Sequence, residues 1–312
     1  MEHQPQPRYR LRGATAPPRL PVRTGAVLAR GLMAGTASGM RAALARAARD
    51  PGSPPVPMLH ARLFFRRRLV LAVDPASLDR QLAVNVTDGT WWIDLADRLT
   101  DGADWTDVIH PLATYEAHRD MVALIEADLR YRDTTLYAVL AAQAAAGAPA
   151  VRFGVALADR ARIDAYFDYY VALVRSIERR GLMPRSALPL RKVPRGGGVR
   201  PWYEWTERDP GIAIGPDGEV LRFAGGRHRT AIARSLGLPS MPVELRLVHT
   251  RWLRSEMERT GKTAERILLD WAAERAPTAA LHRTGWFAHR VAGARSAETI
   301  GALVAAAGLL PV

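Results

Sequence analysis

The stretch Phe223-Ala-Gly-Gly-Arg-His-Arg-Thr-Ala-Ile-Ala-Arg-Ser-Leu-Gly237 decides how this chain of 312 residues is interpreted. It predicts a strand that ends in two glycines and is followed directly by an alanine-rich helix. The first N–H groups of a helix have no partner within it, and the helix dipole adds partial positive charge there. Arg227, His228 and Arg229 add side-chain donors at the same place. The stretch therefore predicts an anion site, and the alternative is a purely structural turn between strand and helix.

The residues around this stretch predict strands. Residues 211–215 and 220–224 flank the turn-forming run Pro216-Asp217-Gly218-Glu219, so they predict a hairpin. Residues 238–248 contain a further strand that includes Pro242-Val243. This succession of elements indicates a small mixed domain of the α/β class, in an α+β arrangement. The elements are a strand, a turn, a strand, a helix and a strand.

The region before this domain predicts mainly helices. The apolar run over residues 62–73 predicts a strand. Helices are predicted over residues 118–131, 134–147 and 159–180. The last of these helices is the clearest, because its apolar residues recur at helical spacing between Asp159, a suitable N-cap, and Gly181, a suitable stop.

Composition and these elements divide the chain into four regions. They are a basic arm and linker rich in Pro, Ala and Arg (1–58), a mixed, mainly helical region (59–194), the small α/β domain (195–252) and a C-terminal helical extension (253–312). Within the arm, residues 1–23 are expected to be disordered and residues 24–49 to be helical.

The positive charge is concentrated near the beginning of the chain. The net charge is +13, and residues 1–68 contribute thirteen arginines against only Glu2 and Asp50, whereas the remainder is nearly balanced. The basic arm is therefore a candidate to bind nucleic acid or an anionic membrane surface, and the alternative is a solvated tail.

The composition excludes several classes of chemistry. The chain has no cysteine, so it holds no disulfide, thiolate zinc site, iron–sulfur cluster or cysteine nucleophile. It also lacks an apolar run long enough for a transmembrane helix, and its proline-rich beginning does not resemble a signal peptide. We therefore expect a cytoplasmic protein.

Residues 208–249, approximately, resemble the ParB/sulfiredoxin superfamily in the order of their elements. The order is a strand, an Asp-Gly turn, a strand, the loop Gly-Gly-Arg-His-Arg, a helix and a strand with Pro-Val. A looser resemblance to uncharacterised ParB-like proteins reaches back to about residue 130. The resemblance implies a small α/β domain whose loop binds the phosphates of a nucleotide or of another phosphorylated ligand. It also implies that Gly225 and Gly226 shape this loop and that His228 and Arg229 contact phosphate.

Two positions depart from the pattern of the superfamily. Sulfiredoxins carry a cysteine in the loop, where this chain has Arg227, so sulfiredoxin chemistry is excluded. Other members carry an acid where this chain has Gly225, and its absence weakens the prediction of phosphoryl transfer. Four acids could replace it as a base or a metal ligand, and the alternative is that they are surface charges. They are Glu204, Glu207, Asp209 and Asp217.

Further residues are candidates for the wall of a pocket beside the loop. Trp202 and Trp205 could stack a base, although a position in the core is the favoured alternative. Thr230, His249 and Trp252 are also pocket candidates, and a structural role is the alternative for the last two.

The sequence leaves three functions open, and with them the question whether the protein is an enzyme. The first is a protein that binds a nucleotide or phosphorylated small molecule, as a phosphotransferase or hydrolase acting with a nucleoside triphosphate and Mg²⁺. The second is a nucleic-acid-binding protein that uses residues 1–58. The third is a noncatalytic ligand sensor or scaffold.

The run Thr260-Gly-Lys-Thr263 has the appearance of the end of a phosphate-binding P-loop. Glu256 stands where such a loop needs its first glycine, and a helical pattern precedes the run in place of a strand. The run therefore predicts a break between two helices, with Thr263 as the cap of the second.

Overall fold

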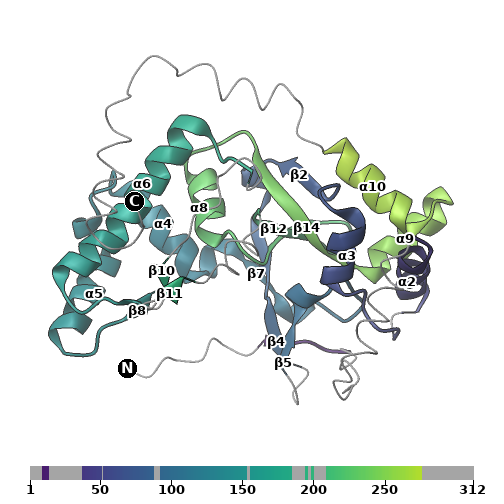
Figure 1. The fold of residues 1–312 in the computed structure, drawn as a ribbon, viewed down its shortest axis with the longest axis horizontal. Helices are drawn as coiled ribbons and strands as arrows, with labels where there is room; N and C mark the ends of the chain where they lie inside the picture. The colour runs from purple at the N-terminus through teal and green to yellow at the C-terminus, as the bar shows by residue number, and fades with distance from the viewer. Residues whose placement is uncertain are drawn as a thin grey trace.

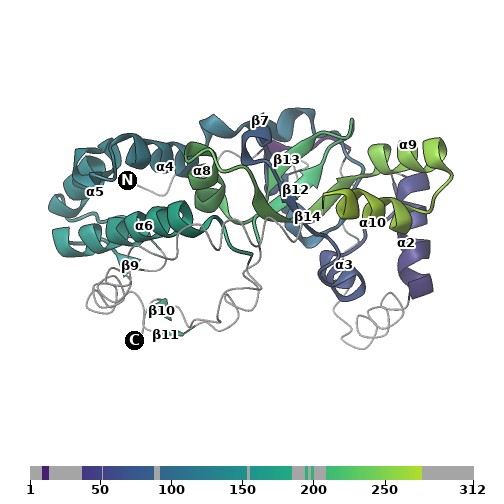
Figure 2. The same ribbon diagram turned by 90° about the horizontal axis from the view of Figure 1, so that it is seen from above.

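The fold is built around one mixed sheet that is flanked by two groups of helices (Figure 1, Figure 2). The computed structural model describes residues 9–13, 37–50, 52–87, 92–152, 155–184, 194–195, 198–199 and 209–275. Seven strands make the central sheet, in the order β2-β14-β12-β13-β3-β7 with β6 paired to β14. Their bounds are β2 Val70–Val73, β3 Arg80–Leu82, β6 Thr100–Asp101, β7 Ile109–Pro111, β12 Gly211–Ile214, β13 Val220–Phe223 and β14 Met241–His249.

The remaining strands form three small sheets. Their bounds are β1 Tyr9–Arg10, β4 Asn85–Thr87, β5 Trp92–Asp94, β8 Val151–Arg152, β9 Val155–Ala156, β10 Pro194–Arg195 and β11 Gly198–Val199. The α-helices are α2 Ala37–Arg49, α3 Met58–Phe65, α4 Glu116–Glu126, α5 Thr135–Ala145, α6 Arg160–Arg180, α8 Arg227–Ser235, α9 Thr250–Thr260 and α10 Ala264–Glu274. These elements confirm the expected mixed class of α and β structure.

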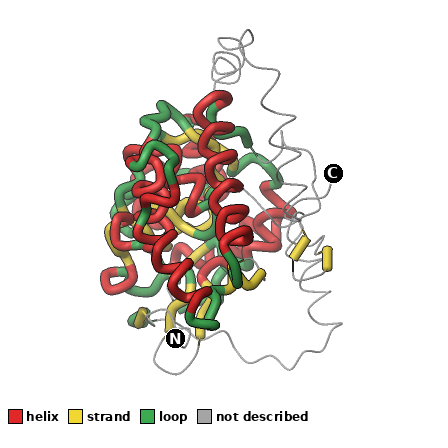
Figure 3. The backbone as a smooth tube through the Cα atoms, turned by 90° about the vertical axis from the view of Figure 1, so that its left-hand side faces the viewer, coloured by secondary structure: helices red, strands yellow, loops and turns green. Residues whose placement is uncertain are grey.

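The helices gather in two groups. Helices α4, α5, α6 and α8 lie on the left of Figure 1, and α2, α3, α9 and α10 lie on its right. Figure 3 views the molecule from the side of α5 and α6, where helices lie in front of the strands. None of the helices in the described part of the chain is both long enough and apolar enough to cross a membrane.

The hairpin and the strand that follows α8 form as the sequence predicts. β12 and β13 are antiparallel, and β14 lies parallel to β12 on its other side. Side chains alternate between the faces of a strand, so Ile212 and Ile214 enter the larger core with the helices, whereas Ala213 enters a smaller core beneath β4 and β5.

A β-bulge interrupts the pairing of β12 with β14. Ile212 is paired with Leu245, but the next residue, Ala213, is paired with Leu247, so the register skips Arg246. A bulge turns a side chain away from the regular alternation of a strand. The bulge allows Arg246 to reach the carbonyl oxygen of Ala224, in the loop that follows β13.

The central sheet crosses the boundary that the sequence analysis placed between 59–194 and 195–252. β2 pairs antiparallel with β14, and β3 pairs parallel with β13. The expected small domain therefore shares its sheet with the earlier region, because long-range strand pairing supplies the missing neighbours of the hairpin.

Two expectations for the first 73 residues are wrong. Residues 9–13 belong to the fold, since β1 pairs with β4 and Leu11 is only 1% exposed. The apolar run over 62–73 is not one strand, because α3 continues to Phe65 and buries one helical face before β2 begins. Residues 1–8 and 14–36 lie outside the described residues.

The expected helix within the basic arm is present as α2, which belongs to the main core. Met40 and Leu44 are fully buried there, and α2 packs against α9 and α10. The basic arm therefore contributes a helix to the fold.

Helix α6 confirms both of its predicted ends. An Asp159 carboxylate oxygen accepts from the N–H of Arg162 at 2.9 Å, and Gly181 follows the last turn with a φ of 68°. The predicted helices over 118–131 and 134–147 are present as the slightly shorter α4 and α5.

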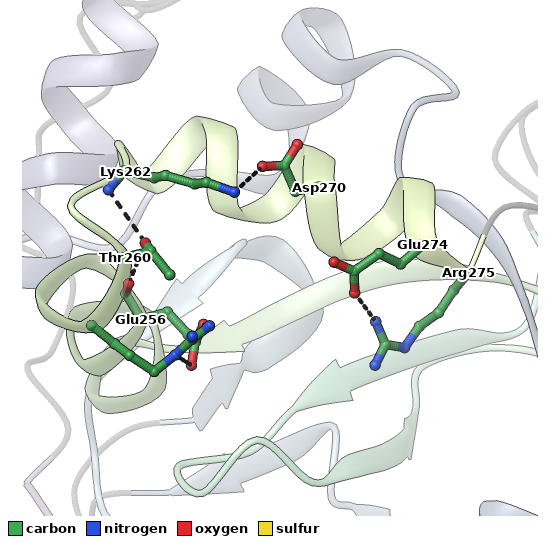
Figure 4. Close-up of polar contacts among 7 residues, drawn as sticks. Glu256, Thr260, Lys262, Asp270, Glu274 and Arg275 are labelled. Carbon is green, nitrogen blue, oxygen red and sulfur yellow. Dashed lines mark hydrogen bonds and ion pairs between the residues drawn. The ribbon is translucent and has the colours of Figure 1, made fainter.

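The connection from α9 to α10 is the predicted helix break (Figure 4). Gly261 ends α9 with a φ of 67°, and the side chain of Thr263 caps α10. Lys262 Nζ lies 2.8 Å from a carboxylate oxygen of Asp270, so this lysine is engaged in a surface ion pair. Residues 276–312, the rest of the expected C-terminal extension, lie outside the described residues.

Candidate functional site

The loop after β13 has the backbone that its two glycines predict. Gly225 and Gly226 have φ values of 76° and 63°, and α8 begins at the next residue. No side chain caps this helix, and Gly226 occupies the N-cap position in the left-handed conformation. The first backbone N–H groups of α8 therefore have no side-chain cap, which is the arrangement that favours an anion.

Arg222 lies directly beneath this loop. It is the third residue of β13, it is 1% exposed, and its Nη2 donates to the carbonyl oxygen of Gly225. Its Nε is buried and has no hydrogen-bond partner. Burial, together with the nearby charges of Arg227 and Arg246, lowers the pKa of this guanidinium to about 9. A buried cation in this setting is stabilised when an anion binds next to it.

Arg246 approaches the same loop from the bulge in β14. Its Nη1 donates to the carbonyl oxygen of Ala224 at 3.1 Å and its Nη2 to that of Asp209 at 2.8 Å. Its Nε lies 2.8 Å from a carboxylate oxygen of Glu244, so this arginine has a local counter-charge. Arg246 therefore holds the loop. Among the described residues, no carboxylate forms an ion pair with Arg222.

His228 lies on the inner side of α8, against α6. Its ring centroid is 4.8 Å from that of Tyr170, and the Tyr170 hydroxyl lies 3.4 Å from its Nε2. Burial lowers the pKa of His228 to about 4, with Arg227 and Arg222 as further causes. At neutral pH this side chain would meet a ligand as a neutral imidazole and not as a cation.

The half-buried histidine makes the free energy of unfolding depend on pH. Because the pKa of His228 in the fold lies near 4, below its ordinary value of 6.5, the unfolded chain takes up the proton first as the pH falls. The contribution of neutral His228 to the free energy of unfolding is fully present above about pH 6.5. About 2 kcal/mol of this contribution is lost between pH 6.5 and pH 4.5. Urea denaturation of wild type and His228→Gln across this range should show a flatter profile for the variant. Parallel profiles would show that His228 does not titrate in this way.

The other loop residues divide into exposed and structural positions. Arg227 is exposed and Arg229 is half-buried. Thr230 is completely buried, and its hydroxyl donates to the carbonyl oxygen of Gly226 at 3.1 Å, so it closes the first turn of α8. Of the predicted contacts, Arg227 is the side chain best placed to meet a ligand from solvent.

The candidate acids and aromatic residues do not all meet at this loop. Asp209 is buried beside it and is the candidate acid that the described residues bring to the loop. The predicted residues outside the described part of the chain are Trp202, Trp205, Glu204 and Glu207.

Asp217, His249 and Trp252 lie at the opposite end of the sheet. β12 and β14 run parallel away from the loop, so the turn after β12 and the residue that ends β14 are neighbours there. Asp217 and His249 line a cleft of about 550 Å³ at that end. The structure therefore does not bring these three candidates together with the loop.

His249 and Trp252 have local structural roles. His249 Nε2 lies 2.8 Å from the carbonyl oxygen of Ala103, and its Nδ1 accepts from the N–H of Arg251, which caps α9. Trp252 packs edge-to-face on Trp271, with ring centroids 6.4 Å apart. These contacts favour the structural alternative for both residues.

Four residues of the site are not predicted by the sequence. Arg222 bonds to the loop, and Gln81, His110 and Tyr115 continue from Arg222 across the sheet. Arg222 stands in an otherwise apolar strand, Val-Leu-Arg-Phe, and a charged residue in a buried strand is the signal that could have identified it. Gln81 and His110 belong to β3 and β7, and Tyr115 precedes α4. Only the pairing of β3 with β13, and of β7 with β3, shows that they lie along the same row as Arg222.

No group of three or more His, Asp or Glu side chains with the arrangement of a metal site occurs within the described residues. In comparisons with protein-family models, curated proteins and solved structures, nothing matches this chain. The case for a function therefore depends on the residues of the site.

Proposed function

We propose that this chain binds the phosphate group of a nucleotide or of another phosphorylated ligand at Gly225, Gly226 and the beginning of α8. The observation that carries the proposal is the buried guanidinium of Arg222 directly beneath a helix N-terminus that no side chain caps. The resemblance to the ParB/sulfiredoxin superfamily supports the same assignment for this loop.

The electrostatics support an anion in preference to a neutral ligand. Arg227 is positive, it lies at the positive end of the helix dipole, and it raises the energy of the charge on Arg222. A bound phosphate would attract both guanidinium groups and accept hydrogen bonds from the backbone of α8.

A ligand bound at this loop could also react there. For phosphoryl transfer or hydrolysis with a magnesium nucleoside triphosphate, Asp209 is the acid beside the loop that could replace the one missing at Gly225. Release of phosphate from ATP that requires Mg²⁺ and is lost in Asp209→Asn would support an enzyme. Binding without turnover would support a ligand sensor.

Calorimetric titration with inorganic phosphate, AMP, and ATP with and without Mg²⁺ tests the binding proposal. We expect Arg227→Ala to weaken binding about tenfold, since one exposed charge-assisted contact is lost. The control is Arg259→Ala, because Arg259 is an exposed arginine on the distant α9 whose partner is Glu256. Binding to none of these compounds, or equal binding by wild type and Arg227→Ala, would refute the proposed site.

A further inference from the structure

A row of polar side chains extends from Arg222 across the central sheet. Arg222 of β13 is paired with Gln81 of β3, and Gln81 is paired with His110 of β7. Paired residues on neighbouring strands place their side chains on the same face of a sheet. Tyr115, just before α4, is close enough to Gln81, Tyr9 and Arg222 for all three to affect its pKa, and its hydroxyl lies within reach of the Gln81 and Tyr9 side chains. We name these four residues, Arg222, Gln81, His110 and Tyr115, the polar row.

The polar row contains an unusual concentration of unsatisfied atoms. Seven buried side-chain atoms of the described residues have no hydrogen bond of normal geometry, and four of them lie in this row. They are Arg222 Nε, Gln81 Oε1, His110 Nε2 and Tyr115 Oη. Buried polar groups are nearly always paired, so a group of unpaired atoms in one place requires an explanation.

The chemistry of these atoms specifies what would satisfy them. Arg222 Nε can only donate a hydrogen bond and Gln81 Oε1 can only accept one, whereas the Tyr115 hydroxyl can do both. A bare anion only accepts, so it leaves Gln81 unsatisfied. A hydroxyl group donates and accepts, so neighbouring hydroxyls can satisfy a donor and an acceptor that lie side by side.

The position of the polar row identifies where these hydroxyls would come from. Arg222 bonds to Gly225 of the loop, so the row begins next to the proposed phosphate position. The group attached to a phosphate in a nucleotide or sugar phosphate is a sugar. Two strand spacings, about 10 Å, separate Arg222 from His110, so the polar row is about as long as a sugar ring with its hydroxyl groups.

We propose that the polar row is a sugar subsite and that the ligand is a sugar phosphate, either free or as part of a 5′-nucleotide. This inference rests on the proposed binding of phosphate at the loop. Arg222 serves both parts of the site, Gln81 accepts a hydrogen bond from a sugar hydroxyl, and Tyr115 bonds to another.

Tyr9 of β1 covers the far end of the polar row. Its ring centroid lies 4.2 Å from that of His110, and β1 is held to β4 by only two paired residues. A ligand that enters from this end displaces the Tyr9 side chain. The early residues of the chain thus contribute the cover of the sugar subsite.

Calorimetry with three probes tests the subsite in the full chain. We expect wild type to bind ribose 5-phosphate at least tenfold more tightly than inorganic phosphate. Gln81→Leu should abolish this difference and leave the affinity for inorganic phosphate unchanged. Tyr115→Phe, which removes one oxygen, should reduce the difference several-fold, and Gln143→Leu on α5 is the control. AMP, the third probe, separates the two sources, because tighter binding of AMP than of ribose 5-phosphate indicates a nucleotide.

The outcomes separate the two proposals. If inorganic phosphate binds but ribose 5-phosphate and AMP bind no more tightly, the polar row holds only water and the subsite is refuted, whereas the phosphate site stands. Equal losses for phosphate and sugar phosphate in Gln81→Leu or Tyr115→Phe would also refute the subsite. If none of the three probes binds, the phosphate site is refuted and the sugar subsite with it.

Discussion

Replacement of Gly226 by alanine should lower the free energy of unfolding by about 3 kcal/mol, because two separate costs add at this position. The first is the left-handed backbone, with a φ of 63°, which a residue with a Cβ atom adopts at a cost of about 1 kcal/mol or more. The second is steric. A Cβ atom at Gly226 would lie 2.6 Å from Cβ and Cγ of Pro210, and a proline ring cannot rotate away.

Gly237 offers a matched control for the first cost alone. Its φ is 60°, but no atom lies within 4 Å of an added Cβ. Gly237→Ala should therefore lower the free energy of unfolding by only about 1 kcal/mol. Urea denaturation at neutral pH measures the free energy of unfolding of both variants. Equal losses would show that Pro210 does not constrain the loop, and that the backbone before α8 can move away from the position described.

The elements that the sequence predicts well are those with local signals. The hairpin of β12 and β13 has its turn residues between two short apolar runs, and α6 has a cap, a helical apolar pattern and a terminal glycine. Each of these signals acts within a few residues. They therefore remain valid whatever the rest of the chain does.

The partners of the hairpin are not predictable in this way. β3 has only three residues, Arg-Gln-Leu, and it becomes a strand because β13 and β7 lie on either side of it. Likewise, α2 has few large apolar residues, and its place in the core depends on the packing of α9 and α10. Such elements are defined by tertiary contacts, which the local pattern does not contain.

The same distinction applies to the site. The glycine loop and the beginning of α8 are local features, and the sequence predicts them. His249 follows the loop closely in the sequence, but the parallel pairing of β12 and β14 carries it to the other end of the sheet. Arg222 and Gln81 meet only because β3 pairs with β13, so the polar row could not be predicted from the sequence.

Replacement of Arg222 by methionine separates a role in binding from a role in the fold. Methionine fills the space of the arginine stem without its charge, and replacing a buried charge by an apolar side chain is often neutral or stabilising. We expect the free energy of unfolding of the ligand-free protein to stay the same or to rise. We also expect phosphate binding to weaken at least about 100-fold, since hydrogen bonds from a charged donor are lost in a buried place.

Arg246→Met is the matched control for this variant. Arg246 is also a buried arginine beneath the loop, but it is bonded to Glu244 and to two backbone carbonyl groups. Its removal leaves the buried carboxylate of Glu244 with a weaker partner, Arg62 at 3.3 Å, so the free energy of unfolding should fall by about 3 kcal/mol. Thermal unfolding compares the stability of the two variants, and titration with inorganic phosphate compares their affinity for phosphate. If Arg222→Met is as unstable as Arg246→Met, or binds phosphate as wild type does, the charge of Arg222 serves the fold and not a ligand.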